Sequence, residues 1–386
     1  MNQKDQHSSS DHVLERENDP AVLPSNRFKT SWTLSGCVIG SSFVLLVVLS
    51  AFLNATFLLW PLTILRWSHL LSHRSCTLAF HFLEGNYFAM LSGYLELVGG
   101  VNLVVTGDEK LEFKSQECVL LICNHRSEVD WIFFWNLAIR LNVHDRVRVM
   151  LKSVIRYAPG AGWAMLLLQY PYINRNWASD EKRLSEAIRS YKTAERGFWL
   201  AMFPEGTALC DTTLKKSHEF AEKQGEAAWN YVLQPRVKGF ELCIDHMDPD
   251  YVVDLTVAYL ELMNGIRPSP VRFLWGQFPI EVHLHVKRYH RSRLMVHKGY
   301  MDLWLKHRFA EKEERLRCFY ETGSFEGEQC VRQNLPLWKL VIPGAAFNVG
   351  LCGIALIVIF KFPLGAGLLF AISATLSIIQ GINFGK

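Results

Sequence analysis

The most informative stretch of the 386-residue chain is Val119-Leu120-Leu121-Ile122-Cys123-Asn124-His125-Arg126-Ser127-Glu128-Val129-Asp130. Its first five residues are continuously apolar, which is typical of a strand buried on both faces, and residues 129–141 then predict a helix. Further strands are expected over residues 101–106 and 198–203. Strands that alternate with helices in this way predict an α/β domain with a mainly parallel sheet and flanking helices.

His125 and Asp130 could form a catalytic pair at the end of this strand. The carboxyl ends of strands in α/β sheets commonly expose catalytic side chains. Acyl transfer to an alcohol needs a base for the hydroxyl proton, and a histidine oriented by a carboxylate provides one near neutral pH. Positions five apart on one helix diverge by about 140°, so His125 is expected in the loop and Asp130 in the first helical turn. Alternatively, Ser127 and Asp130 have the spacing of a helix capping box without any chemistry.

A second motif, Phe203-Pro204-Glu205-Gly206-Thr207, also follows an apolar run. Gly206 permits a sharp turn, and Glu205 and Thr207 would present polar groups at the same edge of the sheet. On its own, this motif is equally compatible with an ordinary turn from a strand into a loop.

Together, the two motifs resemble hallmark blocks of the glycerolipid acyltransferase superfamily, which includes the lysophosphatidic acid acyltransferases. They match its HxxxxD catalytic block and its EGT lysolipid-binding block. The resemblance implies that His125 is the general base and that Asp130 orients it. It also implies that three residues bind the lysolipid, namely Glu205, Gly206 and Thr207.

The chain is also similar to this superfamily outside the two main blocks. Arg175, in Tyr172-Ile173-Asn174-Arg175, matches an arginine that holds the acceptor phosphate, and Pro235 matches a proline near the acyl-donor site. Over roughly residues 95–320 the similarity is closest to the lysocardiolipin and lysophosphatidylinositol acyltransferases. It is carried by Lys152, residues 157–165, residues 235–240 with Arg236, and residues 254–259. Departures at Glu128 and at residues 208–210 leave the choice of acceptor open.

The resemblance implies an acyl-CoA:lysophospholipid acyltransferase that acts in phospholipid synthesis or remodelling. The acceptor would be lysophosphatidic acid, lysophosphatidylinositol or lysocardiolipin, and its free hydroxyl would attack the thioester directly. Acyl-CoA would be a co-substrate, and no further cofactor is expected. The family also implies the endoplasmic reticulum membrane.

The residues are also compatible with other functions. Cys123 lies two positions from His125 and could be a nucleophile, although burial in an apolar strand is its commoner fate. A non-catalytic membrane lipid-binding protein on the same fold is a further alternative. The nine cysteines never form a CxxC pair, so the sequence indicates neither a zinc site nor a disulfide framework. A net charge of +4 is too small to predict binding to nucleic acid.

Charge-free segments predict a membrane anchor at each end. Residues 30–65 would reach about 54 Å as a straight helix, against about 30 Å of hydrocarbon, so a strong tilt or a bend near Asn54 or Pro61 is expected. Residues 340–360 and 362–382 are apolar runs separated by Lys361, which predicts a transmembrane hairpin. Basic residues are concentrated before the hairpin, which predicts that the catalytic domain faces the cytosol.

A helix is expected over residues 302–320, with Leu303, Trp304, Phe309, Leu316 and Phe319 as its apolar members. Along the whole chain, we predict six segments. The segments are a polar disordered tail (1–29), an N-terminal membrane segment (30–66), interfacial or amphipathic helices (67–100), a catalytic domain (101–290), a helical extension (291–336) and the transmembrane hairpin (337–386).

Overall fold

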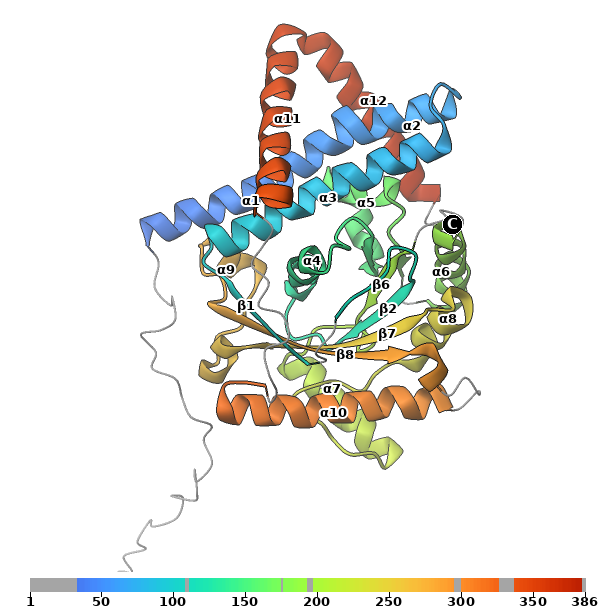
Figure 1. Ribbon diagram of the computed structural model, residues 1–386, viewed down its shortest axis with the longest axis vertical. Helices are drawn as coiled ribbons and strands as arrows, with labels where there is room; N and C mark the ends of the chain where they lie inside the picture. Colours follow the sequence, from blue (N-terminus) through green and yellow to red (C-terminus); the bar gives the residue numbers. More distant parts are fainter. Residues whose placement is uncertain are drawn as a thin grey trace, which may run out of the picture.

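The computed structural model describes residues 33–107, 111–174, 176–192, 197–294, 300–325 and 337–383. The predicted tail at residues 1–29 therefore lies outside the described residues. The centre of the molecule is a six-stranded sheet (Figure 1). Neighbouring strands run parallel except for one antiparallel pair, Tyr251–Tyr259 with Glu281–His290. In spatial order the strands are β1 (Asn102–Gly107), β8 (Glu281–His290), β7 (Tyr251–Tyr259), β2 (Val119–Cys123), β6 (Trp199–Met202) and β3 (Val147–Val149). The prediction of a mainly parallel sheet is confirmed.

Alternation along the strands divides the core between the two faces of the sheet. In β2, Leu121 and Cys123 pack with α4 (Asp130–Arg140), whereas Leu120 and Ile122 pack with α8 (Val237–Met247) and α10 (Tyr300–Thr322). Successive side chains of a strand point to opposite faces, so a continuously apolar strand serves both cores. The sheet is thus covered by helices on both sides (Figure 1).

Shorter elements complete the domain. They are a two-stranded sheet of β4 (Leu151–Lys152) and β5 (Tyr172–Ile173), 3₁₀ turns at Ser153–Tyr157, Leu260–Asn264 and Arg291–Arg293, and helices α5 (Ala161–Leu167), α6 (Trp177–Lys192), α7 (Asp211–Gln224) and α9 (Pro270–Leu274).

One predicted member of the α10 core is wrong. Leu303 is 63% exposed, whereas Leu305, Phe309, Leu316 and Phe319 are completely buried. The buried positions follow spacings of three and four residues, which keep them on one face of the helix. Leu303 lies off that face, and Leu305 takes the buried position.

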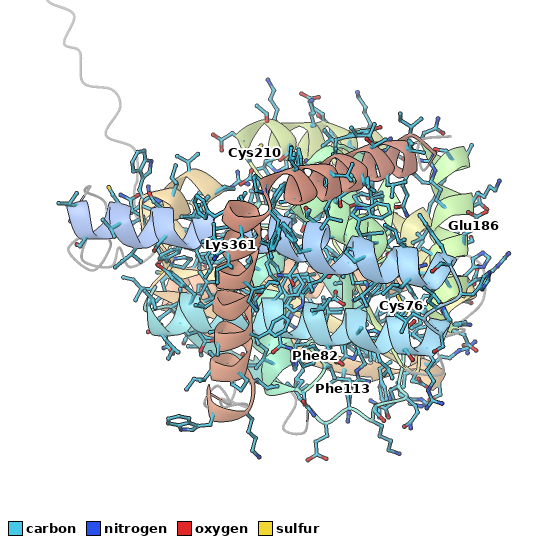
Figure 2. The ribbon with its side chains drawn as sticks, turned by 90° about the horizontal axis from the view of Figure 1, so that it is seen from above. Cys76, Phe82, Phe113, Glu186, Cys210 and Lys361 are labelled. Atoms are coloured by element: carbon cyan, nitrogen blue, oxygen red, sulfur yellow. The ribbon has the colours of Figure 1, made fainter. Side chains whose placement is uncertain are left out.

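The N-terminal segment forms one continuous helix of 34 residues, Leu34–Trp67. It consists of α1 (Leu34–Asn54), a π-helical turn (Ala55–Leu59) and α2 (Trp60–Trp67), so regular α-helix is interrupted directly after Asn54. Beside it runs α3 (His73–Leu97), and together the two form a layer over the α/β domain (Figures 1 and 2). A single helix thus occupies most of the region for which several interfacial helices were predicted.

The predicted hairpin is formed by α11 (Ile342–Lys361), which a π-helical turn at Leu337–Val341 precedes, and α12 (Pro363–Asn383). Figure 2 labels Lys361 at the turn. Buried hydrogen bonds join the hairpin to the N-terminal helix: Asn54 Nδ2 donates to Asn348 Oδ1 (3.0 Å) and Trp60 Nε1 to Ser377 Oγ (2.8 Å). Within the described ranges, this N-terminal helix and both hairpin helices are long and apolar enough to cross a bilayer. The chain is a membrane protein in which the N-terminal helix and the hairpin are in contact.

Candidate active site

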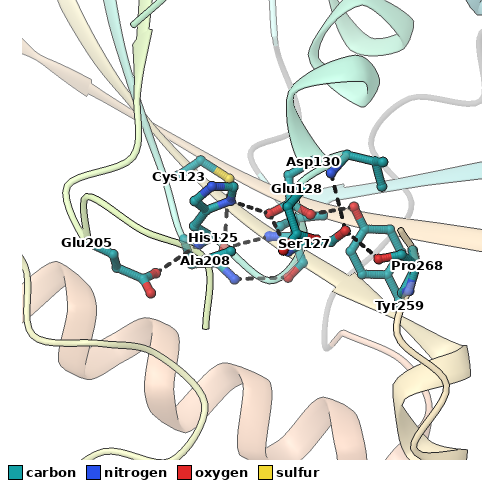
Figure 3. Close-up of polar contacts among 12 residues, drawn as sticks. Cys123, His125, Ser127, Glu128, Asp130, Glu205, Ala208, Tyr259 and Pro268 are labelled. Atoms are coloured by element: carbon teal, nitrogen blue, oxygen red, sulfur yellow. Dashed lines mark hydrogen bonds and ion pairs between the residues drawn. The ribbon is translucent and has the colours of Figure 1, made fainter. Parts of the chain in front are cut away.

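The His125–Asp130 pair lies where β2 ends and α4 begins. His125 follows the strand in a loop, and Asp130 is the first residue of the helix, as the spacing predicted. His125 Nδ1 lies 2.9 Å from Asp130 Oδ2 (Figure 3). The Asp130 side chain is completely buried, whereas the His125 ring remains partly accessible. One partner is therefore fixed inside the protein and the other is open to a ligand.

Asp130 is held by two further donors. Its Oδ2 accepts the Ser127 backbone N–H at 2.9 Å, and its Oδ1 accepts the Tyr259 hydroxyl at 2.6 Å (Figure 3). Burial and the neighbouring Asp130 carboxylate raise the pKa of Tyr259 well above its usual range, so this hydroxyl stays protonated and remains a donor. Because donors surround it, the carboxylate keeps one orientation toward His125.

The capping alternative is partly realised in the same loop. Asp130 accepts from Ser127 N–H, as the third helical residue of a capping box does. The Ser127 hydroxyl instead accepts from Val129 N–H (3.2 Å) and donates to the Pro268 carbonyl (2.6 Å). Asp130 therefore supports the helix start and His125 at the same time, so the two interpretations do not exclude each other.

The exposed side of His125 faces a cavity of about 490 Å³. Phe203 stacks on the imidazole with ring centroids 4.1 Å apart, and Phe134 stacks in turn on Phe203 at 5.3 Å. With Nδ1 turned toward Asp130, Nε2 is the nitrogen left for a ligand. Stacking and the hydrogen bond together fix the ring, a requirement for a general base.

Glu205 lies behind the wall of this cavity and does not line it. Its Oε1 accepts the His125 backbone N–H (2.8 Å), and its Oε2 accepts that of Leu233 (3.1 Å). Burial raises the pKa of Glu205 to about 8, against the lowering effect of these two N–H donors. Both oxygens are engaged with backbone, which favours positioning of the His125 loop over direct contact with a substrate.

Three of the predicted substrate-binding residues line the same cavity as His125, namely Lys152, Gly206 and Arg236, and Lys238 joins them. Gly206 has φ +72°, and a Cβ there would lie 3.2 Å from Arg236 Nε, so only glycine fits without strain.

The other predicted residues lie elsewhere. Thr207 is half-buried in the turn, and Pro235 is buried directly before Arg236, the residue that precedes the first turn of α8. Neither lines the cavity. Arg175 falls outside the described residues.

Cys123 is poorly suited to act as a nucleophile. It is completely buried among apolar residues, and burial raises the pKa of its thiol well above the usual range. The thiolate is the reactive form of cysteine, so this environment disfavours attack.

Sequence reasoning missed the role of Tyr259 and of Phe203. Tyr259 ends the apolar strand β7, and its hydroxyl needs a partner when buried, which was the available signal. Its partner, however, lies 129 residues away in sequence and depends on strand order. Asn124 has a similar non-local role, because its amide exchanges two hydrogen bonds with the Val257 backbone (2.8 and 3.0 Å) and ties the motif to β7.

Comparison with known proteins agrees with this geometry. The profile of the family "Acyltransferase" matches residues 102–239, and that of "Acyltransferase C-terminus" matches residues 272–343. The chain is 35% identical to mouse lysocardiolipin acyltransferase 1 over 286 residues, which is 73% of this chain and 74% of that protein. It is 31% identical to the probable 1-acyl-sn-glycerol-3-phosphate acyltransferase 5 of Arabidopsis thaliana over 293 residues, 75% of this chain and 74% of the relative.

A third relative is lysophosphatidylinositol acyltransferase 10 of Caenorhabditis elegans, 32% identical over 251 residues that make up 64% of this chain and 62% of the relative. No solved structure matches the chain significantly. The paired motifs, the parallel sheet that carries them and these relatives agree, and the chain belongs to the acyltransferase family and is an enzyme of that family.

Proposed function

We propose that this enzyme transfers a fatty acyl group from acyl-CoA to the free hydroxyl of a lysophospholipid. The observation that carries the proposal is the His125–Asp130 hydrogen bond at the wall of the 490 Å³ cavity. An imidazole fixed on one nitrogen and open on the other suits removal of a hydroxyl proton. The relatives are named as acyltransferases of lysocardiolipin, lysophosphatidylinositol or 1-acyl-sn-glycerol-3-phosphate, and these names support a lysophospholipid acceptor.

The mechanism that we propose needs no covalent enzyme intermediate. His125 Nε2 takes the proton as the lysolipid oxygen attacks the thioester carbonyl, and Asp130 stabilises the imidazolium that forms. The tetrahedral intermediate then collapses, the C–S bond breaks, and His125 returns the proton to the departing CoA sulfur. The products are a phospholipid with one additional acyl ester and free CoA.

The cations of the cavity suit the phosphates of both substrates. Lys152, Arg236 and Lys238 line it together with His125, and phosphate oxygens prefer such donors. Arg175 remains our predicted ligand of the acceptor phosphate. We further propose that Gly206 lines the acceptor end of the cavity, that Glu205 and Thr207 support this end from behind its wall, and that Pro235 supports the donor end beside Arg236.

We also propose that the enzyme resides in the endoplasmic reticulum membrane with its catalytic domain in the cytosol. The support is the charge distribution of the sequence, since Arg332 and Lys339 precede α11 closely, whereas the hairpin turn has Lys361 alone. Cytoplasmic segments close to membrane spans are enriched in Lys and Arg.

The test uses the purified full-length protein with radiolabelled acyl-CoA and a panel of the three lysolipids named above, analysed by thin-layer chromatography. A labelled phospholipid product, formed by acylation of the lysolipid and dependent on His125, is the expected result. Binding of lysolipid without any product would instead identify a non-catalytic lipid-binding protein. Product formation through a trapped acyl-enzyme would contradict direct attack.

A further inference from the structure

A second cavity lies on the other side of α6 from the catalytic one. It measures about 990 Å³ and is bounded by α2, α3, α5, α6 and α12. Asp180 and Leu184, four residues apart on one face of α6, line the catalytic cavity. Lys182, Arg183 and Glu186, which lie on another face, line the second cavity. The helix therefore separates two compartments, and the second contains neither His125 nor Asp130.

One side of this cavity is basic. Its lining residues include Arg66, Lys182 and Arg183, against a single carboxylate, Glu186, which Figure 2 labels on α6. Arg66 Nη1 lies 3.2 Å from His73 Nδ1. None of the ion pairs among the described residues includes Arg66. This excess of positive charge favours an anionic ligand.

Two buried polar atoms of the cavity lack a partner. Among the described residues, Arg183 Nη1 and Gln380 Oε1 are inaccessible and make no hydrogen bond, and both residues line this space. A buried polar group without a partner is costly, so such atoms indicate where a polar ligand group could be bound. These atoms belong to residues on two different walls of the cavity, one on α6 and one on α12.

The remaining wall is apolar and belongs largely to membrane-side helices. Its members are Trp67, Phe80, Leu166, Leu167, Leu376 and Ile379. Trp67 and Arg66 end the Leu34–Trp67 helix, and Leu376 and Ile379 lie near the end of α12, so two candidate membrane spans finish at this cavity. Tryptophan and arginine at the end of a span are typical of the headgroup level of a bilayer. The cavity therefore combines a cationic floor at headgroup level with an apolar side.

We propose that this cavity is a second lipid site, separate from the catalytic one, for a diacyl glycerophospholipid with an anionic headgroup. The phosphate contacts Arg66, Lys182 and Arg183, and an acyl chain lies against Leu376 and Ile379. Inorganic phosphate satisfies only the basic side, and ligand cavities of about 300–1,000 Å³ hold molecules much larger than that ion. The site does not depend on the proposed reaction, because it shares no residue with the catalytic pair.

The test is photo-crosslinking of the full-length protein in phosphatidylcholine nanodiscs that contain a few per cent of phosphatidylglycerol with a diazirine in its acyl chain. Digestion and mass spectrometry should find headgroup-dependent labelling of Leu166 and Leu167 on α5, which line the apolar wall and lie outside the candidate membrane spans. Photoreactive phosphatidylcholine should label them weakly, and millimolar inorganic phosphate should not compete. Equal labelling by both lipids, or displacement by inorganic phosphate, would overturn the proposal.

Variants locate the site. The double variant Lys182→Gln/Arg183→Gln should weaken labelling about tenfold or more, because each basic residue near an anionic surface contributes appreciably to binding. Arg66→Gln, on a different helix, should also weaken it, which guards against misfolding of the double variant. The matched control Arg189→Gln/Lys192→Gln removes two exposed charges from the same helix and should label normally. His125→Ala should also label normally, and loss of labelling there would place the lipid in the catalytic cavity instead.

Discussion

Strand β7 contributes a residue to the surroundings of two charged pairs, one on each face of the sheet. The two pairs differ in their access to solvent. On the α4 side, Tyr259 donates to Asp130, whose partner His125 is partly accessible. On the α10 side, Asp254 pairs with Lys312, and both side chains are completely buried. One pair keeps an open nitrogen at a cavity, and the other has no access to solvent.

The completely buried pair Asp254–Lys312, called the sealed pair below, is supported by additional hydrogen bonds. Lys312 Nζ also donates to the Leu255 carbonyl at 2.6 Å and lies 3.4 Å from Thr256 Oγ1. Removing two charges from water is expensive, and such bonds are needed to compensate. The comparison teaches that a buried pair alone does not indicate catalysis. What distinguishes His125 is a cavity on its free side.

The largest effect on the rate should come from removing the His125 side chain of the catalytic pair. His125→Ala should lower the rate of acyl transfer by about 10² to 10⁴, the usual contribution of a general base. Its thermal midpoint should change little, because the imidazole is partly exposed. Steady-state assays and thermal denaturation of the same preparation would measure both.

Cys123→Ala is the matched control for this change, since Cys123 ends β2 only two residues before His125. It should keep its activity, because the buried thiol takes no part in the proposed reaction. An inactive but folded Cys123→Ala enzyme, or an active His125→Ala enzyme, would remove the distinction between the two pairs.

The sealed pair should show the reverse behaviour. Lys312→Met leaves Asp254 as an uncompensated buried charge, and breaking a buried pair in this way costs about 3–5 kcal/mol of stability. The turnover of the protein that remains folded should be nearly normal. A stable Lys312→Met enzyme with a greatly reduced rate would assign the α10 face a role in catalysis.

Sequence predicted what is local and missed what depends on strand order. The apolar run Val119–Cys123 predicted β2 correctly, and the five-residue spacing placed His125 in a loop and Asp130 at a helix start. No local pattern links Asp254 to Lys312 or Tyr259 to Asp130, because these contacts require β7 to lie beside β2 with α10 across it. The antiparallel pairing of β8 with β7 was missed for the same reason.

A smaller effect is expected from Tyr259→Phe. The change removes one donor from Asp130 and leaves those from Ser127 and His125, and a hydrogen bond to a charged group contributes about 1.5–3 kcal/mol. Stability and rate should fall together and modestly, because the same carboxylate serves both. The apparent KM for either substrate should stay unchanged. A change confined to KM would instead place the Tyr259 hydroxyl in contact with substrate.

Glu205 shares a property with each pair. It is buried like Asp254, and it supports the loop that carries His125. Glu205→Gln replaces one acceptor oxygen with an NH₂ group that must face a backbone N–H of His125 or Leu233. Leaving such a donor unsatisfied costs about 1–3 kcal/mol. The thermal midpoint should fall, and the rate should fall with it because the His125 backbone loses its anchor.

The pH dependence of this loss tests whether burial or the two N–H donors dominate at Glu205. Burial raises its pKa in the folded protein to about 8, well above that of an unfolded glutamate. Between these values the folded state binds a proton that the unfolded state has released, so this contribution to stability is full at low pH and declines as the pH rises toward 8. Glutamine does not titrate, so the gap in thermal midpoint between the wild type and Glu205→Gln should be larger at pH 5 than at pH 9. A gap that stays constant between pH 5 and pH 9 would mean that the two N–H donors outweigh burial and keep Glu205 ionised.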